Sequence, residues 1–274
     1  VFPIIRRLLQ RLETLQRSVQ RFGEGALSVR VSEQGQDEVA DLARQFNAAA
    51  ARIEALVKTH KSLLANASHE LRSPLTRIRM GLELMGGNQP SPAFREEILR
   101  NIAELDQLVD EILLASRLDA READVGTVEL VDLIGLAAEE CARVDAELDV
   151  TAVPEGLEVR GVAKLLRRAL RNLLENARRY SQGDITVVLQ RHDGQAQLSV
   201  LDRGPGVPPA LRERIFEPFY RLPGASERAG GVGLGLALVR SIAQRHNGSV
   251  RCEDQPDGSG GACFVLRLPL ALTK

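Results

Sequence analysis

A histidine followed directly by a glutamate, His69-Glu70, is the pair in this sequence best suited to group transfer. Apolar residues at helical spacing lead to Ser68, and His69 lies one position beyond that seam, so its imidazole is predicted to face solvent. A carboxylate near imidazole favours the tautomer with a free nucleophilic nitrogen and can accept its proton. Pro74 removes a backbone donor and predicts a kink one turn below. Taken alone, an exposed histidine beside a glutamate is more often an ordinary helix surface.

Two asparagines, Asn172 and Asn176, are one helical turn apart and are therefore predicted to face the same way. Amide oxygens on one face can hold Mg²⁺ or its waters beside phosphate groups, since Mg²⁺ keeps several of its waters in proteins. The simpler interpretation of this pair is a solvated helix face.

An acidic residue and several glycines occupy positions suited to a nucleotide. Asp202 ends an apolar strand, where a carboxylate can accept a hydrogen bond from an adenine amino group, and Gly204 and Gly206 let the backbone approach closely. A second set of glycines leads into a predicted helix and consists of Gly231, Gly233 and Gly235. The N-terminus of such a helix offers backbone N–H groups to phosphates. No Gly-Lys-Ser/Thr follows, and the position near the end of the chain argues against a dinucleotide fingerprint.

Residues 217–230 are rich in Pro, Gly, Ala and Ser, a composition that predicts a mobile lid. Arg221 and Arg228 are its candidate phosphate contacts, and Phe216 and Phe219 are expected to anchor it by packing. The other three histidines are expected to be structural or simply exposed: His60 in a helical seam, His192 at a hairpin turn and His246 at a helix end.

The segments around these residues resemble, in the same order, the sequence boxes of sensor histidine kinases. Residues 68–75 resemble the phosphoacceptor box, 172–180 the N box, 202–206 the first Gly box, 216–221 the F box and 231–236 the second Gly box. The start of the chain, with Pro3, Gly25 and Asp37-Glu38, is similar to a HAMP signal-relay domain. The resemblance covers nearly the whole chain, and five boxes in order are far more specific than one.

The resemblance implies three domains: a HAMP domain at 1–56, a dimerisation and phosphotransfer hairpin at 57–123, and an ATP-binding domain at 124–274. The implied fold is multidomain α and α/β. It combines an N-terminal parallel helical bundle, an antiparallel hairpin that forms a dimeric four-helix bundle, and a C-terminal α/β sandwich of the Bergerat type.

The resemblance also implies roles for residues at matching positions. Autophosphorylation of His69 from MgATP is expected, with Glu70 as base or orienter and Asn176 as the direct Mg²⁺ ligand. Arg179 would neutralise phosphate charge, and Tyr180 would pack on the adenine. The family's phosphatase activity often uses Thr or Asn four residues after the histidine. Ser73 stands there, so phosphatase activity is expected in weaker form.

Helical seams support the dimer without reference to the family. Seams with alternating three- and four-residue steps run through 5–22, 39–56, 64–85 and 98–116, and the apolar face of the last two is too wide for one hairpin to cover. The second and third seams join through a stutter at His60. We hypothesise that this junction passes helix motion to the hairpin, with a passive adaptor as the alternative.

The C-terminal half alternates helical and strand-like segments, which predicts one sheet covered by helices. Strands are expected at 127–131, 148–153, 185–191, 197–201, 248–252 and 263–268, with a hairpin turn at Asp193-Gly194. Helices are expected at 133–144, 162–180 and 234–245.

Composition limits the remaining possibilities. Lys and Arg number 36 against 37 Asp and Glu, so the net charge of −1 gives no reason to expect a nucleic acid partner. Three cysteines without metal-ligand spacing are expected to be buried, reduced thiols. No apolar run reaches the roughly 20 residues that span a bilayer.

The first residues, Val1-Phe2-Pro3, are followed by isoleucines and a series of arginines. A chain that starts just after a membrane helix would begin this way, and a basic amphipathic helix is the alternative. With the resemblance, we expect the cytoplasmic portion of a bacterial inner-membrane protein, anchored through a segment preceding residue 1, with a response-regulator receiver domain as its partner.

Two other classes of protein remain as alternatives. An ATPase of the gyrase, chaperone and mismatch-repair group shares the nucleotide fold but has no phosphoacceptor box, so His69-Glu70 argues against it. A catalytically dead scaffold, or a protein that acts only as a phosphatase, is disfavoured by intact Asn176, Asp202 and Gly boxes.

Overall fold

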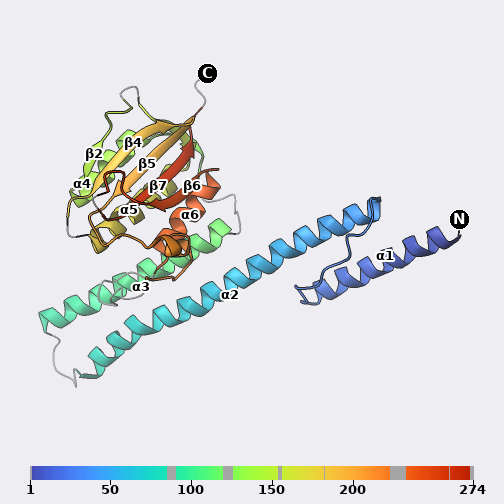
Figure 1. Cartoon of the computed structure of the whole chain (residues 1–274). Helices are drawn as coiled ribbons and strands as arrows, with labels where there is room; N and C mark the ends of the chain where they lie inside the picture. The colour runs from blue at the N-terminus through green and yellow to red at the C-terminus, as the bar shows by residue number, and fades with distance from the viewer. Residues whose placement is uncertain are drawn as a thin grey trace. The chain divides into compact units, whose positions relative to one another are not determined.

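The computed structural model describes residues 2–84, 91–119, 126–153, 156–181, 183–222, 233–258 and 260–271. The chain forms two compact units, Val1–Ala65 and Asn66–Lys274, and helix α2 contributes to both (Figure 1). Among the described helices, none has the length and apolar character needed to cross a membrane.

The first unit is a pair of parallel helices joined by an extended connector. Helix α1 spans Phe2–Gly23, and α2 begins at Glu38. Their core consists of Leu15, Val31 and Ala43, with Phe46 packed against it. Asp37 caps the start of α2 through the Ala40 N–H and forms an ion pair with Arg11 on α1. That hydrogen bond with Arg11 lowers the pKa of the Asp37 carboxyl.

The second unit begins with an antiparallel hairpin. Helix α2 continues without interruption through Pro74 to Leu84, and α3 spans Pro92–Asp119. Arg77 on α2 donates a hydrogen bond to Asn101 and pairs with Glu104 on α3. Gly81 leaves room for the Phe94 ring, because a Cβ at that position would collide with it. The predicted connecting loop, 86–92, lies largely outside the described residues.

The rest of the second unit is an α/β domain. Its main sheet has five strands in the order β2-β4-β5-β7-β6, and β1 pairs with β3 in a small antiparallel sheet. The strand bounds are Glu129–Asp132 (β1), Glu147–Asp149 (β2), Glu158–Gly161 (β3), Thr186–His192 (β4), Gln195–Leu201 (β5), Ser249–Glu253 (β6) and Cys263–Pro269 (β7). The helices are α4 (Leu133–Val144), α5 (Ala163–Tyr180) and α6 (Gly235–Arg245), with short 3-10 turns at Pro209–Leu211 and Arg214–Phe216.

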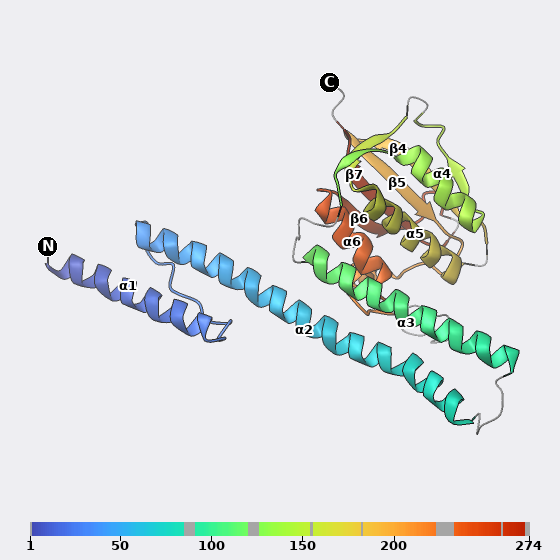
Figure 2. The same cartoon turned by 180° about the vertical axis from the view of Figure 1, so that it is seen from behind.

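Alternation along the central strands explains why the helices cover one face of the sheet. On β5, Ala196, Leu198 and Val200 are buried and pair with Leu268, Leu266 and Phe264 of β7. The intervening Gln197 and Ser199 are polar and turn to the opposite face, because successive strand residues point to opposite sides. Helices α4, α5 and α6 form a layer on the apolar face (Figure 2).

The predicted fold class is confirmed: a helical N-terminal region, a long hairpin and a C-terminal α/β domain. The β4–β5 turn at Asp193 and Gly194 has two positive φ angles, as this type of hairpin requires. Strand β3 was missed, and the strand predicted at 148–153 is only the short β2.

All three cysteines are buried and free, and burial raises the pKa of Cys252 to about 12.

Candidate active site

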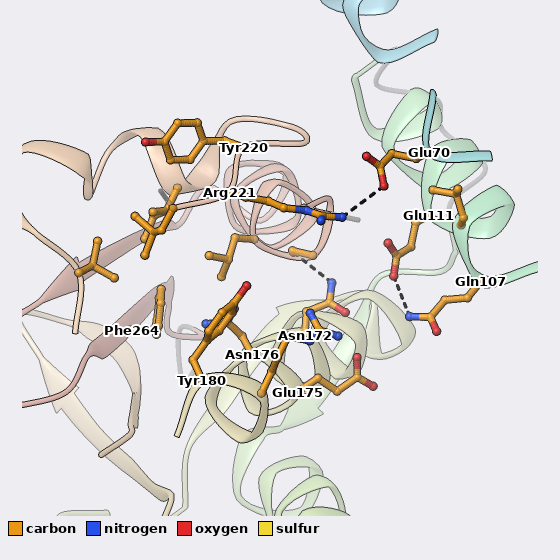
Figure 3. Close-up of a pocket in the computed structure, with 18 of the residues that line it drawn as sticks. Glu70, Gln107, Glu111, Asn172, Glu175, Asn176, Tyr180, Tyr220, Arg221 and Phe264 are labelled. Atoms are coloured by element: carbon orange, nitrogen blue, oxygen red, sulfur yellow. Dashed lines mark hydrogen bonds and ion pairs between the residues drawn. The ribbon is translucent and has the colours of Figure 1, made fainter. Parts of the chain in front are cut away.

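A cleft of about 680 Å³ lies in the second unit, between the hairpin and the α/β domain (Figure 3). One wall belongs to the α/β domain and the other to helices α2 and α3. Predicted site residues on the α/β wall are Asn172, Asn176, Arg179, Tyr180, Asp202, Gly206, Arg221, Gly233 and Gly235. The cleft therefore gathers residues from all of the predicted nucleotide boxes that the structure describes.

Asp202 is buried on this wall and is held by hydrogen bonds from the backbone. Its side chain is only 3% exposed, and Oδ1 accepts hydrogen bonds from the Gly204 N–H at 2.8 Å and the Ala262 N–H at 3.2 Å. The Gln255 amide donates to its backbone oxygen. Among the described residues, the hydrogen bonds of this carboxylate reach Oδ1, which leaves Oδ2 to accept a donor from a ligand.

Two glycines allow the backbone to close around Asp202. A Cβ on Gly204 would lie 2.6 Å from the Tyr180 carbonyl oxygen, so no side chain fits at that position. Gly206 has φ +74 and would place a Cβ 2.9 Å from the Gly261 carbonyl oxygen. Both positions thus require glycine, for close approach and for a left-handed conformation respectively.

The two asparagines have different environments. Asn172 is 5% exposed, and its amide donates a 3.1 Å hydrogen bond to the Gly235 carbonyl oxygen at the start of α6. Asn176, one turn further along α5, is half-buried and lines the cleft. Asn172 therefore ties α5 to the start of α6, while Asn176 is among the residues that line the cleft.

The hairpin wall consists of one stripe from each helix. Glu70, Ser73, Pro74 and Arg77 come from α2, and Glu104, Gln107, Leu108 and Glu111 come from α3. Both sets follow the i, i+3, i+4, i+7 spacing of a single helix face. Glu70 Oε2 accepts a 3.2 Å ion-pair hydrogen bond from Arg221, which extends across the cleft (Figure 3).

His69 is exposed and does not line the cleft, although its neighbour Glu70 does. Consecutive helical residues are about 100° apart around the axis, so the two side chains leave α2 in different directions. The predicted exposure of His69 is thus observed. The face of α2 that meets the cleft is the adjacent face, which carries Glu70.

Three family models match the chain in consecutive segments. The HAMP domain model matches residues 4–55, the His Kinase A (phospho-acceptor) domain model residues 59–121, and the model for histidine kinase-, DNA gyrase B- and HSP90-like ATPases residues 161–272. The chain belongs to the sensor histidine kinases. In the terms of that family, the α/β wall of the cleft is the ATPase-type domain, and the hairpin is the phosphoacceptor domain.

Curated sensor kinases are similar along most of this chain. Sensor protein RstB of Escherichia coli (strain K12) is 36% identical over 276 residues, which cover 98% of this chain and 63% of that protein. Signal transduction histidine-protein kinase/phosphatase MprB of Mycobacterium sp. (strain KMS) is 35% identical over 252 residues, covering 86% and 48%. The chain therefore spans only about half to two thirds of these relatives.

A solved structure has the same fold as this sensor kinase chain. Histidine kinase ThkA in complex with response regulator protein TrrA matches with a TM-score of 0.63 and 24% identity, covering 86% of this chain and 68% of that chain. At this identity the likeness concerns the fold.

Some predicted site residues of the kinase lie elsewhere. Gly204 supports Asp202 from outside the cleft lining, and Arg228 and Gly231 fall outside the described residues. Sequence reasoning missed the α3 stripe and the Gln255 contact with Asp202. Regular spacing of polar residues on α3 is a signal that could have revealed the α3 stripe. The Gln255–Asp202 contact joins residues that are distant in sequence, so no local pattern indicates it.

His246 caps the end of α6 and links it to α5. Its Nδ1 lies 2.7 Å from the Ile242 carbonyl oxygen, and its Nε2 accepts a 3.0 Å hydrogen bond from the Val162 N–H. Only a neutral imidazole with its proton on Nδ1 satisfies both contacts. Burial lowers the pKa of His246 below the ordinary value of 6.5.

This arrangement predicts acid sensitivity of the ATPase-type domain. The pKa of His246 is lower in the folded state than in the unfolded state. Its contribution to the free energy of unfolding is therefore fully present when the pH is above the unfolded-state pKa, and it is lost as the pH falls through the folded-state pKa. Urea midpoints at neutral and mildly acidic pH should differ more for the wild type than for His246→Gln. The exposed His192, changed to Gln, is the matched control; equal pH dependence in all three chains would contradict the assignment.

Proposed function

We propose that the chain phosphorylates His69 from MgATP and passes the phosphoryl group to an aspartate of a response-regulator receiver domain. The observation that carries this proposal is the single cleft that holds Asn176 and Asp202 on one wall and Glu70, the neighbour of His69, on the other. The family membership and the three consecutive domain matches support it.

The α/β wall fits a nucleotide in size and in chemistry. Asp202 Oδ2 accepts the adenine amino hydrogen, Tyr180 packs on the base, and the backbone at Gly204 and Gly206 approaches it closely. Arg179, which also lines the cleft, neutralises phosphate charge. Asn176 offers the amide oxygen suited to Mg²⁺, which when bound neutralises charge on the phosphates and orients them.

The chemical step is a phosphoryl transfer. An imidazole nitrogen of His69 attacks the γ-phosphorus, the bond from that phosphorus to the bridging oxygen breaks, and ADP leaves. Glu70 accepts the proton that His69 loses or fixes its tautomer. Most of the acceleration comes from positioning and charge neutralisation, because such transfers need little covalent help from the protein.

The proposed assembly is a homodimer formed by the hairpins. Large apolar side chains that lie exposed in a single chain occupy predicted seam positions, Leu64, Leu75, Leu82, Ile102 and Val109, and two apolar positions beside the seams, Leu99 and Leu113. Burying them in a four-helix bundle is the simplest way to remove this apolar surface from water. We propose domain limits of 1–56, 57–123 and 124–274.

We place this portion on the cytoplasmic side of a bacterial inner membrane, anchored through a segment that precedes it. The HAMP match and the kinship with sensor proteins support that location. A receiver domain as partner is supported by the solved ThkA complex, whose title names a response regulator.

Ser73 is proposed to support dephosphorylation of the regulator. The relative MprB is named as a kinase/phosphatase, which supports this proposal. Its side chain is exposed on the stripe that includes Glu70, one turn from His69, where a hydroxyl can orient a water. Because threonine restricts the hydroxyl to fewer rotamers, Ser73→Thr should raise the dephosphorylation rate about 2- to 5-fold. Measuring loss of label from a phosphorylated receiver tests this, and an unchanged rate would show that Ser73 is not limiting.

Phosphotransfer tests the proposed function as a whole. The chain is incubated with γ-labelled ATP and Mg²⁺, freed of nucleotide, and mixed with a receiver domain. Label should leave the chain and appear on the receiver, and a receiver with its acceptor aspartate changed to Asn should gain none. Label that stays on the kinase with every receiver tried would contradict the transfer step.

A further inference from the structure

A buried ion pair joins the ATPase-type domain to the hairpin at the α3 wall of the cleft. Glu111 on α3 is only 6% exposed. Its Oε1 accepts a 2.9 Å hydrogen bond from Arg168 on α5 and a 3.1 Å hydrogen bond from Gln107. A carboxylate removed from water needs such partners, and the only cation paired with it among the described residues comes from the other domain.

The pair fixes which hairpin face meets the cleft. Helix α3 also packs against α6, so the contact between the domains includes more than this ion pair (Figures 1 and 2). In this arrangement α2 turns the Glu70 stripe toward the cleft, Arg221 engages Glu70, and His69 stays exposed outside it. The docked domain therefore meets the neighbour of the phosphoacceptor and not the phosphoacceptor itself.

The two interdomain ion pairs differ in shielding. The side chains of Glu111 and Arg168 are 8% and 27% exposed, whereas those of Glu70 and Arg221 are 36% and 31% exposed. Solvent screens the second pair more strongly. Removing one charge of the first pair would leave its partner buried and unpaired, so the docked arrangement depends more on the first pair. Glu111 lines the cleft and Arg168 does not, but neither residue has an assigned role in ATP binding or chemistry, so this pair is the cleaner one to test.

We propose that the Arg168–Glu111 pair is a restraint on autophosphorylation, which must open before His69 can reach the cleft. The inference rests on the proposed function and deepens it by naming a regulatory contact. A conformational change that moves α3 relative to α5 separates the two charges and releases the domain. Water then solvates both groups, so the released state pays no penalty for buried, unpaired charge.

Glu111→Gln tests the restraint in the full 274-residue chain. The amide keeps the shape of the side chain but removes the charge, and the initial autophosphorylation rate at saturating ATP should rise about 3- to 10-fold. The KM for ATP should not change, since neither residue is assigned to the nucleotide. The double exchange Glu111→Arg with Arg168→Glu should lower the rate again toward the wild-type value.

Glu83→Gln is the matched control. Glu83 lies on α2 of the hairpin outside the cleft lining, and its ion pair is with Arg79 on the same helix. Losing that pair leaves the contact between domains intact, so the rate should stay within about twofold of the wild type.

A distance measurement reports on the contact without depending on activity. Spin labels at Glu96→Cys on α3 and His192→Cys on the β4–β5 hairpin lie on exposed sites of the two domains. The native cysteines are buried with raised thiol pKa values, as for Cys141 at about 11, so they should react slowly. Labelled chain diluted with excess unlabelled chain should give a broader distance distribution after Glu111→Gln.

The outcomes separate the restraint from the underlying function. A faster rate with a broader distribution, both reversed by the charge exchange, supports it. An unchanged or slower autophosphorylation rate in Glu111→Gln, while the wild type is phosphorylated normally, overturns the restraint and leaves the proposed function standing. If neither the wild type nor any variant is phosphorylated by ATP, the proposed function is overturned, and the restraint with it.

Discussion

His69→Gln is expected to lower label incorporation from γ-labelled ATP by at least about 1,000-fold, because the nucleophile itself is removed. Glutamine is polar and has a similar reach, but its amide nitrogen does not attack phosphorus. The affinity for ATP should be unchanged, since His69 is exposed and does not line the cleft. Label incorporation and a nucleotide titration on the same protein separate the two effects.

His60→Gln provides the matched control for this substitution. His60 lies on the same helix α2 but is half-buried in the seam, with no assigned chemistry. Its replacement should leave labelling within a few-fold of the wild type. If label persisted in His69→Gln and disappeared in His60→Gln, the assignment of the phosphoacceptor would be wrong.

Asp202→Asn is expected to weaken ATP binding by roughly 100-fold or more, since a site built around one hydrogen bond rejects a mismatched partner. The Gly204 and Ala262 N–H groups hold one oxygen of this side chain and will keep the single amide oxygen of asparagine in that place. The asparagine N–H₂ then faces the cleft in the place of Oδ2. It is a hydrogen-bond donor, and so is the adenine amino group, so the two groups cannot form a hydrogen bond.

Nucleotide titrations of wild type and variant with ATP and GTP measure this effect. The variant should lose most of its preference for ATP, because the 6-oxo group of guanine is an acceptor. Asp254→Asn is the control, because that exposed carboxylate pairs with Arg212 near the same strands but does not line the cleft. Equal ATP affinity in wild type and Asp202→Asn would place the adenine elsewhere.

Local sequence pattern predicted the elements that position the site. The three helices of the α/β domain have strong apolar periodicity, and two of their predicted bounds differ from the structure by one residue while α4 agrees at both ends. Short β-rich runs predicted the long strands β4, β5 and β7, which contribute many of the buried residues of the sheet. Strand β3 was missed because four residues with two apolar positions, Val159 and Gly161, give too short a pattern.

The pairing of distant residues could not be predicted in the same way. The bond from Asn172 to Gly235 and the ion pair from Arg168 to Glu111 join residues that only the folded chain brings together. The spacing of Asn172 and Asn176 predicted a shared face, but not that the first would be used to hold α6. Likewise, the pairing of Glu70 with Arg221 depends on how the α/β domain sits on the hairpin.

Locating the phosphoryl group on the wild-type chain is the most direct test of the central claim. After incubation with ATP and Mg²⁺, peptides are mapped by mass spectrometry under neutral conditions, and the acid and alkali stability of the modification is measured. A phosphoryl group on the His69 imidazole, labile in acid and stable in alkali, is the predicted result. A phosphoryl group on a hydroxyl, a carboxylate or a different histidine would contradict the account.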